Sequence, residues 1–66
     1  MDVSKEIKNC RKHLGLTQKK LGEISGLSQN TICSYETGRY TSITVVEQIL
    51  NAMGYELVVV KRRRRP

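Results

Sequence analysis

The sequence predicts an all-α fold, a bundle of four to five short helices, followed by a short C-terminal β-strand. Apolar residues recur at spacings of three and four through most of residues 1–54, which is typical of helices with one buried face. Serine or threonine precedes several of these segments and glycine follows them, as helix caps do. Because 66 residues suffice for only one core, we expect one helical domain over residues 1–54, a strand over 55–60 and a basic tail over 61–66.

The first two helices are predicted at about residues 4–14 and 18–24. One face of the first carries Val3, Ile7, Cys10 and Leu14, and Gly15 ends it. Thr17 is the expected N-cap of the second helix, whose Leu21 and Ile24 should face inward before it stops at Ser25-Gly26. Gly22 interrupts this helix at a cost of about 1 kcal/mol relative to alanine. A residue so small in that place indicates that another helix passes very close to it.

The third helix is predicted from Ser28, its N-cap, to Glu36, with Gly38 as its stop. Its inward side holds only Ile32 and Tyr35, and Leu27 should fill the core just before it begins. The opposite side is short and uncharged, and consists of Gln29, Asn30, Cys33 and Ser34. A merely solvated helix face would hold lysine and glutamate, so this face is suited to exchange hydrogen bonds with a specific partner.

A fourth helix and a strand complete the expected fold. Ser42 should cap the helix, Gly54 should end it, and its inward side carries Ile43, Val46, Ile49, Leu50 and Met53. The sequence period then changes from 3.6, typical of a helix, to 2, typical of a strand. The aromatic and β-branched residues at 55–60 therefore predict a strand. No other segment offers a second strand, so we expect two copies to pair theirs antiparallel in a homodimer, through Tyr55, Leu57, Val58, Val59 and Val60. The alternative is a strand that packs against its own helices.

Charge and composition narrow the class of protein. The net charge of +6 comes mainly from Lys61 to Arg65, because residues 1–60 are nearly balanced. This tail could contact DNA phosphates, contact an acidic partner or remain solvated. Cys10, Cys33 and His13 lack metal-ligand spacing, so we expect reduced thiols, no metal and no cofactor. No secretory segment is visible and no apolar run approaches the ~18 residues of a membrane span. A cytoplasmic protein without membrane contact is therefore expected.

Residues 18–36 have the pattern of a helix-turn-helix, in which Ser25-Gly26-Leu27 joins two short helices. Around it, Arg11, Leu14 to Gly22, Gly26 to Ser28, Thr31-Ile32 and Tyr35 to Arg39 resemble the phage repressor and Cro family of helix-turn-helix domains. The resemblance runs from about Ile7 to Gly54. It implies a compact lambda-repressor-like bundle that binds double-stranded DNA as a dimer on a pseudo-palindrome.

The resemblance also implies roles for individual residues. Gln29, Asn30 and Ser34 match base-reading positions, and glutamine or asparagine can pair bidentately with adenine. Cys33 lies beside them and could pack against a thymine methyl, act as a redox switch or be inert. The positions assigned to DNA phosphates are Thr17, Gln18, Ser28, Thr31, Arg39 and Tyr40. Arg11 and Glu36 match a buried ion pair that has a structural role.

The expected function is therefore a transcriptional regulator, in the first place a repressor. The strand after the fourth helix also resembles the antitoxins of the high-persistence toxin–antitoxin group, whose C-terminal strands form an intersubunit sheet. An antitoxin that neutralises a toxin partner and represses its own operon is the alternative. RNA binding is disfavoured because three tyrosines and no phenylalanine or tryptophan supply little stacking surface. No nucleophile–base pair indicates an enzyme, and no small-molecule ligand is expected.

Overall fold

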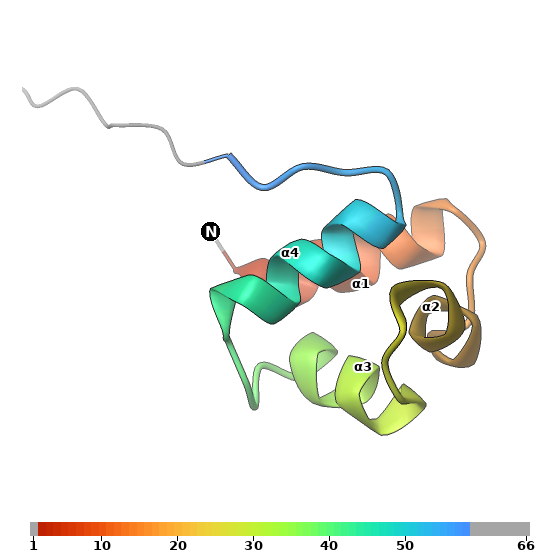
Figure 1. The fold of residues 1–66 in the computed structure, drawn as a ribbon, viewed down its shortest axis with the longest axis horizontal. Coiled ribbons are helices and arrows are strands. Elements are labelled where there is room, and N and C mark those ends of the chain that lie inside the picture. Colours follow the sequence, from red (N-terminus) through yellow and green to blue (C-terminus); the bar gives the residue numbers. More distant parts are fainter. Residues whose placement is uncertain (1, 59–66) are drawn as a thin grey trace, which may run out of the picture.

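The computed structural model describes residues 2–58, which form four helices. These are α1 (Val3–His13), α2 (Gln18–Ser25), α3 (Gln29–Glu36) and α4 (Ile43–Ala52). α1 and α4 lie one behind the other across the top of Figure 1, with α2 and α3 beneath them. The predicted all-α bundle is confirmed, with four helices in the described residues.

Short polar side chains begin three of the helices. Asp2 accepts from the backbone amides of Ser4 and Lys5 at the start of α1, at 3.1 and 3.4 Å. A hydrogen bond from the Ser4 hydroxyl and the backbone bonds hold the pKa of the Asp2 carboxyl below its usual value. Thr17 and Ser28 cap α2 and α3 as predicted. Ser42 stands at the N-cap of α4, but its side chain forms no capping bond there.

The core lies where the four helices meet. Its buried apolar side chains are Ile7, Leu21, Ile32, Tyr35, Val46, Ile49, Leu50 and Met53. The prediction that Leu14, Ile24 and Ile43 face inward is wrong, because they are 45%, 43% and 56% exposed. All three lie at or next to the end of a helix, where the helical period continues but little of the core remains to cover the side chain. Leu27 is partly buried against the core, close to its expected place.

At Gly22 the two helices of the helix-turn-helix approach each other closely. A Cβ atom on Gly22 would lie 2.7 Å from the carbonyl oxygen of Leu27 and 3.4 Å from the backbone nitrogen of Gln29. Gly26 then takes φ +75°, a left-handed conformation that glycine adopts without strain. The absence of a side chain at Gly22 therefore lets the beginning of α3 pack directly on the backbone of α2, as the sequence suggested.

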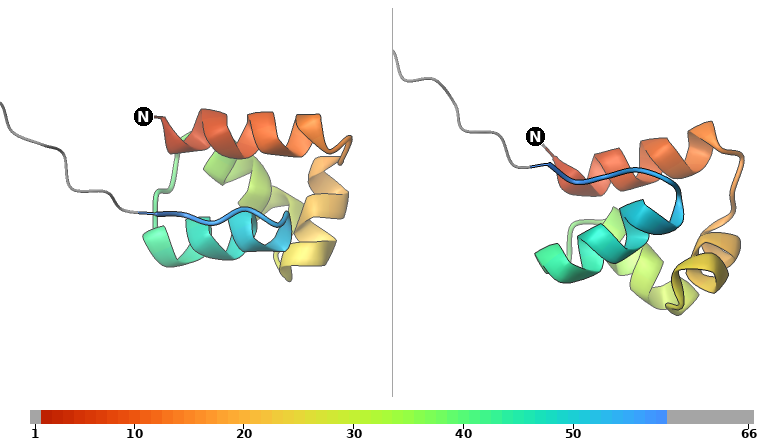
Figure 2. Two further views of the ribbon diagram at one scale, coloured as in Figure 1. Left: turned by 90° about the horizontal axis from the view of Figure 1, so that it is seen from above. Right: turned by 45° about the horizontal axis from the view of Figure 1, so that its top comes forward.

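The segment after α4 turns back along α1 and α4 (Figure 2). The backbone amide of Tyr55 donates to the carbonyl of Leu50 at 2.9 Å, and Leu57 packs half-buried against the core. Residues 55–58, the described part of the expected strand, are not assigned as a strand in this single chain. A strand needs a neighbouring strand to complete its hydrogen bonds, and one chain provides none over the described residues. Val59, Val60 and the tail lie outside the described residues.

Candidate nucleic-acid interface

The short polar face of α3 is open to solvent. Gln29, Asn30 and Cys33 are exposed and Ser34 is half-buried. Three of these residues line one surface hollow of 420 Å³, which is bounded by Asn30, Cys33, Ser34, Thr37 and Arg39. The structure thus brings most of the base-reading candidates together beside a cationic side chain, with Gln29 in the first turn of the same helix.

The opposite face of α3 holds the helix in place. Ile32 is fully buried and Tyr35 is 6% exposed, so both are anchored in the core between the helices. At the N-terminus the hydroxyl oxygen of Ser28 accepts from the amide of Thr31 at 3.1 Å. Because both the cap and the apolar side are fixed, the polar side can meet a partner with little loss of conformational freedom.

Two of the phosphate candidates begin α2. The Thr17 hydroxyl oxygen accepts from the amide of Lys20 at 3.0 Å, which leaves its hydroxyl proton for another acceptor. Gln18 Nε2 donates one hydrogen to Glu36 Oε1 at 3.2 Å. The second amide hydrogen of Gln18 takes no part in that bond and can donate to a phosphate oxygen.

The other phosphate candidates belong to α3 and the loop that follows it. The hydroxyl oxygens of Ser28 and Thr31 lie 2.8 Å apart and share a hydrogen bond, so one hydroxyl proton remains to be donated elsewhere. Arg39 is exposed and forms no ion pair within residues 2–58. Tyr40 is 57% exposed, and its ring lies against Tyr35 with centroids 6.2 Å apart.

Arg11 and Glu36 form the ion pair that joins α1 to the end of α3. Arg11 Nε and Nη2 donate to the two carboxylate oxygens at 2.6 and 3.1 Å, a bidentate arrangement. The side chains are only 12% and 2% exposed, respectively. Arg11 Nη1 also donates to the carbonyl of Leu16 at 2.8 Å. The pair therefore ties α1, the loop before α2, α2 itself through Gln18, and α3 into one network.

Gln48 also supports the helix-turn-helix, although the sequence pattern did not predict this role. From α4, its Nε2 donates to the backbone carbonyl of Ser25 at 2.7 Å, at the last residue of α2. The Ser25 hydroxyl in turn donates to the carbonyl of Leu21 at 2.7 Å. A polar residue of an amphipathic helix normally faces solvent, so no local sequence pattern could have shown that Gln48 supports the turn between α2 and α3.

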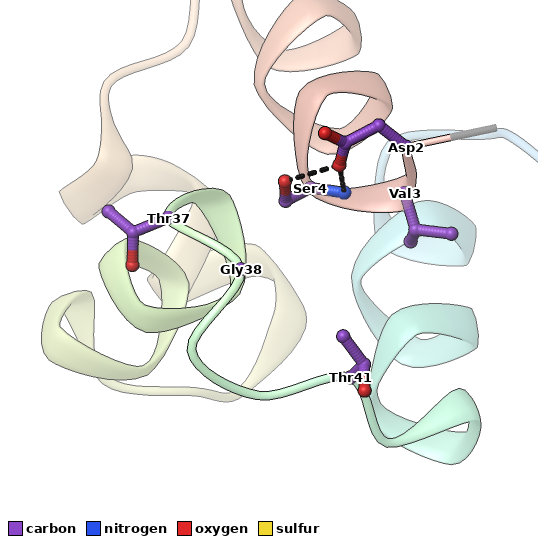
Figure 3. A pocket seen from close by; sticks show the side chains of 6 residues that line it. All are labelled: Asp2, Val3, Ser4, Thr37, Gly38 and Thr41. Atoms are coloured by element: carbon purple, nitrogen blue, oxygen red, sulfur yellow. Dashed lines mark hydrogen bonds between the residues drawn. The ribbon is translucent and has the colours of Figure 1, made fainter.

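A second hollow, of 690 Å³, lies between the beginning of α1 and the end of α3 (Figure 3). Asp2, the charged residue in its lining, uses one carboxylate oxygen to cap α1. A Cβ atom on Gly38 would lie 3.6 Å from the Ser4 hydroxyl oxygen, so the turn after α3 closes against α1. A carboxylate repels phosphate, and this hollow is therefore not part of the candidate interface.

No helix within residues 2–58 has both the length and the apolar character needed to cross a membrane.

An HTH-type transcriptional regulator of Methanothermobacter thermautotrophicus is 43% identical over 51 residues, which cover 76% of this chain and 74% of that protein. A solved structure described as a toxin-antitoxin module from Streptococcus pneumoniae superimposes with a TM-score of 0.75 and 35% identity, covering 92% of this chain and 68% of that one. A family profile described as helix-turn-helix matches residues 7–60. That match and the geometry of α2 and α3 agree with a binding protein rather than an enzyme, and the chain belongs to the helix-turn-helix family.

Proposed function

We propose that this protein is a sequence-specific DNA-binding transcriptional regulator that acts as a repressor. The observation that carries the proposal is the polar face of α3, exposed on one side and anchored by Ile32 and Tyr35 on the other. The major groove is about 12 Å wide and admits one α-helix. Membership in the helix-turn-helix family and the similarity to a transcriptional regulator support the same function.

Base reading is assigned to Gln29 and Asn30, with Cys33 and Ser34 beside them. A bidentate bond from an amide side chain to adenine N6 and N7 gives about 1–3 kcal/mol of discrimination. Ser34 is short and half-buried, so its contribution is expected to pass through water. Cys33 offers an apolar surface that a thymine methyl could contact.

Phosphate contacts position the protein on the duplex. We assign them to Thr17, Gln18, Ser28, Thr31, Arg39 and Tyr40. Thr17 and Gln18 lie at the N-terminus of α2, where the helix dipole and unpaired amides favour an anion. Such contacts carry no sequence information and fix the register of α3 in the groove.

The regulator is proposed to act as a dimer in the cytoplasm. A dimer places two recognition helices on half-sites about one helical turn, roughly 34 Å, apart, and obstructs transcription by occupying the operator. The C-terminal segment, with Tyr55, Leu57 and Val58 in its described part, is the proposed interface. Truncation after Gly54 should yield a monomer in sedimentation equilibrium, and a dimer of the shortened chain would place the interface elsewhere.

An antitoxin is the second candidate. The observation that favours it is the similarity to a toxin-antitoxin module, which covers 92% of this chain. In this role the same DNA-binding surface would repress the operon, while another surface would bind a toxin. Co-purification of a second, stoichiometric protein expressed from a neighbouring gene is expected for an antitoxin and not for a solitary repressor.

The primary test is selection of bound duplexes from a random DNA pool, followed by affinity measurements on selected and scrambled sites. Asn30→Ala should lower affinity for the selected site by about 5- to 150-fold, which corresponds to 1–3 kcal/mol. Its affinity for scrambled DNA should change little, because phosphate contacts remain. Asn9→Ala, on the exposed side of α1, is the matched control. An equal loss on both duplexes would refute the assignment of Asn30 to base reading.

A further inference from the structure

Arg39 follows the turn that ends α3, and the backbone of that turn folds it back onto the helix. The amide of Arg39 donates to the carbonyl of Ser34 at 2.9 Å, and the amide of Gly38 donates to the carbonyl of Tyr35 at 3.4 Å. With Gly38 at φ +79°, these two bonds form a Schellman motif, and Figure 3 shows the turn at Gly38. The chain therefore reverses at the end of α3, and Arg39 lies beside Ser34 rather than further along the helix axis.

The space outside this turn is left open. A Schellman motif frequently carries an apolar contact between the residue after the turn glycine and a residue of the last helical turn. Here the residue after the glycine is Arg39, and its counterparts are the short side chains of Ser34 and Cys33, which cannot fill the space. The result is the hollow of 420 Å³, lined by Asn30, Cys33, Ser34, Thr37 and Arg39. The turn thus places a cationic residue in the hollow that holds three of the base-reading candidates.

The guanidinium of Arg39 is left without an anionic partner in the described part of the chain. Arg39 is exposed and forms no ion pair within residues 2–58, and no carboxylate lines the hollow. The Ser34 carbonyl accepts from the Arg39 amide and also from the Thr37 hydroxyl, the latter at 3.1 Å. A carbonyl oxygen has two lone pairs, so both are used. The donors of the guanidinium therefore face a hollow in which an acceptor from outside the protein fits.

We propose that Arg39 is a specificity-determining residue that reads a guanine in the major groove, close to the base pair that Asn30 reads. This proposal rests on the regulator function proposed above, and it gives Arg39 a base edge in place of the phosphate assigned there. Guanine presents O6 and N7 in the major groove, and the planar fork of arginine donates to both. Ser34 lies four residues after Asn30, a rise of about 6 Å along α3, or roughly two base steps. The guanine should therefore lie within about two base pairs of the adenine that Asn30 reads.

A chemical change in the DNA separates a base contact from a phosphate contact. In the selected site, 7-deazaguanine in place of this guanine removes the N7 acceptor and leaves every phosphate unchanged. The wild-type protein should bind the modified duplex about fivefold more weakly or worse, because one charge-assisted hydrogen bond is lost. Arg39→Ala should bind the modified and unmodified duplexes equally, because the side chain that detects N7 is gone.

Base preference provides the second measurement. Affinities are compared on the selected site, on the same site with the G·C pair changed to A·T, and on a scrambled sequence. The wild-type protein should prefer guanine by about 5- to 150-fold, and Arg39→Ala should lose nearly all of this preference. Its affinity for scrambled DNA should fall far less. Lys8→Ala, which removes an exposed charge of α1, is the matched control and should keep the full preference.

The folded state should survive the substitution. The Schellman turn uses the backbone amide of Arg39, which alanine retains, so Arg39→Ala should keep the helical circular dichroism of the wild-type protein. A change in base preference then reports on the lost side chain and not on unfolding.

A phosphate contact by Arg39 would give a different set of results. Arg39→Ala would weaken binding equally on all three duplexes and reduce the slope of log K against log salt by about 0.9, and 7-deazaguanine would leave wild-type affinity unchanged. Either result would overturn the proposal, as would a selected site without guanine within two base pairs of the adenine read by Asn30. The regulator function would stand in these cases if the wild-type protein still prefers its selected site, whereas equal binding of all duplexes would remove both.

Discussion

Removing one partner of the Arg11–Glu36 pair should destabilise the fold strongly, while replacing both should not. Arg11→Met leaves a carboxylate that is 2% exposed with only the Gln18 amide as a side-chain partner. Breaking a buried pair in this way costs about 3–5 kcal/mol. For a chain of this size each kcal/mol lowers Tm by about 4–8 °C, so a loss of at least ~12 °C is expected.

Glu36→Leu should lower the free energy of unfolding by less than Arg11→Met does. The Arg11 side chain is 12% exposed, keeps its bond to the Leu16 carbonyl and is long enough to move its guanidinium into water. The double variant Arg11→Met/Glu36→Leu removes both charges, and its free energy of unfolding should fall by only about 1–2 kcal/mol, because the Leu16 carbonyl and the Gln18 amide each lose a hydrogen bond. The coupling free energy of the cycle should therefore exceed about 2 kcal/mol.

Urea denaturation followed by far-UV circular dichroism measures all four corners of the cycle. Protein concentration must be equal throughout, because association adds to the apparent stability. Lys8→Met and Glu23→Leu, at exposed positions of α1 and α2, are the charge-removal controls and should change stability by less than about 0.5 kcal/mol. Single losses that simply add up in the double variant would refute the reasoning, because they would mean that the two charges do not depend on each other.

Three further predictions concern the turn, the first cap and the tail. Gly22→Val should lower the free energy of unfolding by about 1–3 kcal/mol, since even a Cβ atom would lie 2.7 Å from the Leu27 carbonyl oxygen. Urea denaturation measures the loss, and Lys19→Val, at an exposed position of the same helix, is the control. The lowered pKa of Asp2 means that its capping contribution is present above the usual carboxyl pKa and is lost as pH falls through the lowered value. In an NMR titration, the chemical shift of the Ser4 amide should therefore follow the protonation of Asp2, and Asp2→Asn should remove this pH dependence. If the Ser4 amide of the Asp2→Asn variant titrates as before, the cap is not the source of the pH dependence. Deletion of residues 61–66 should reduce the slope of log K against log salt by about 0.9 for each phosphate contact that the tail makes, and an unchanged slope would exclude the tail from DNA.

Local chemistry explains why so much of the fold could be predicted. Thr17 and Ser28 cap their helices through bonds to amides three residues away, and Gly26 adopts its left-handed turn whatever surrounds it. These interactions depend on neighbouring residues in the chain, so they can be read from the order of residue types. The outward position of Asn30 and Cys33 follows from the same helical period once Ile32 and Tyr35 are assigned to the core.

The sequence by itself thus determined the helices, the turn and the polar face of α3, because each depends on contacts within a few residues. Only the tertiary structure decided which apolar residues are covered: Ile24 and Ile43 follow the helical pattern but stay largely exposed. It also decided that Gln48 reaches the carbonyl of Ser25, a contact across 23 positions. Such contacts depend on how whole helices are placed against one another, and no local pattern of residues records that placement.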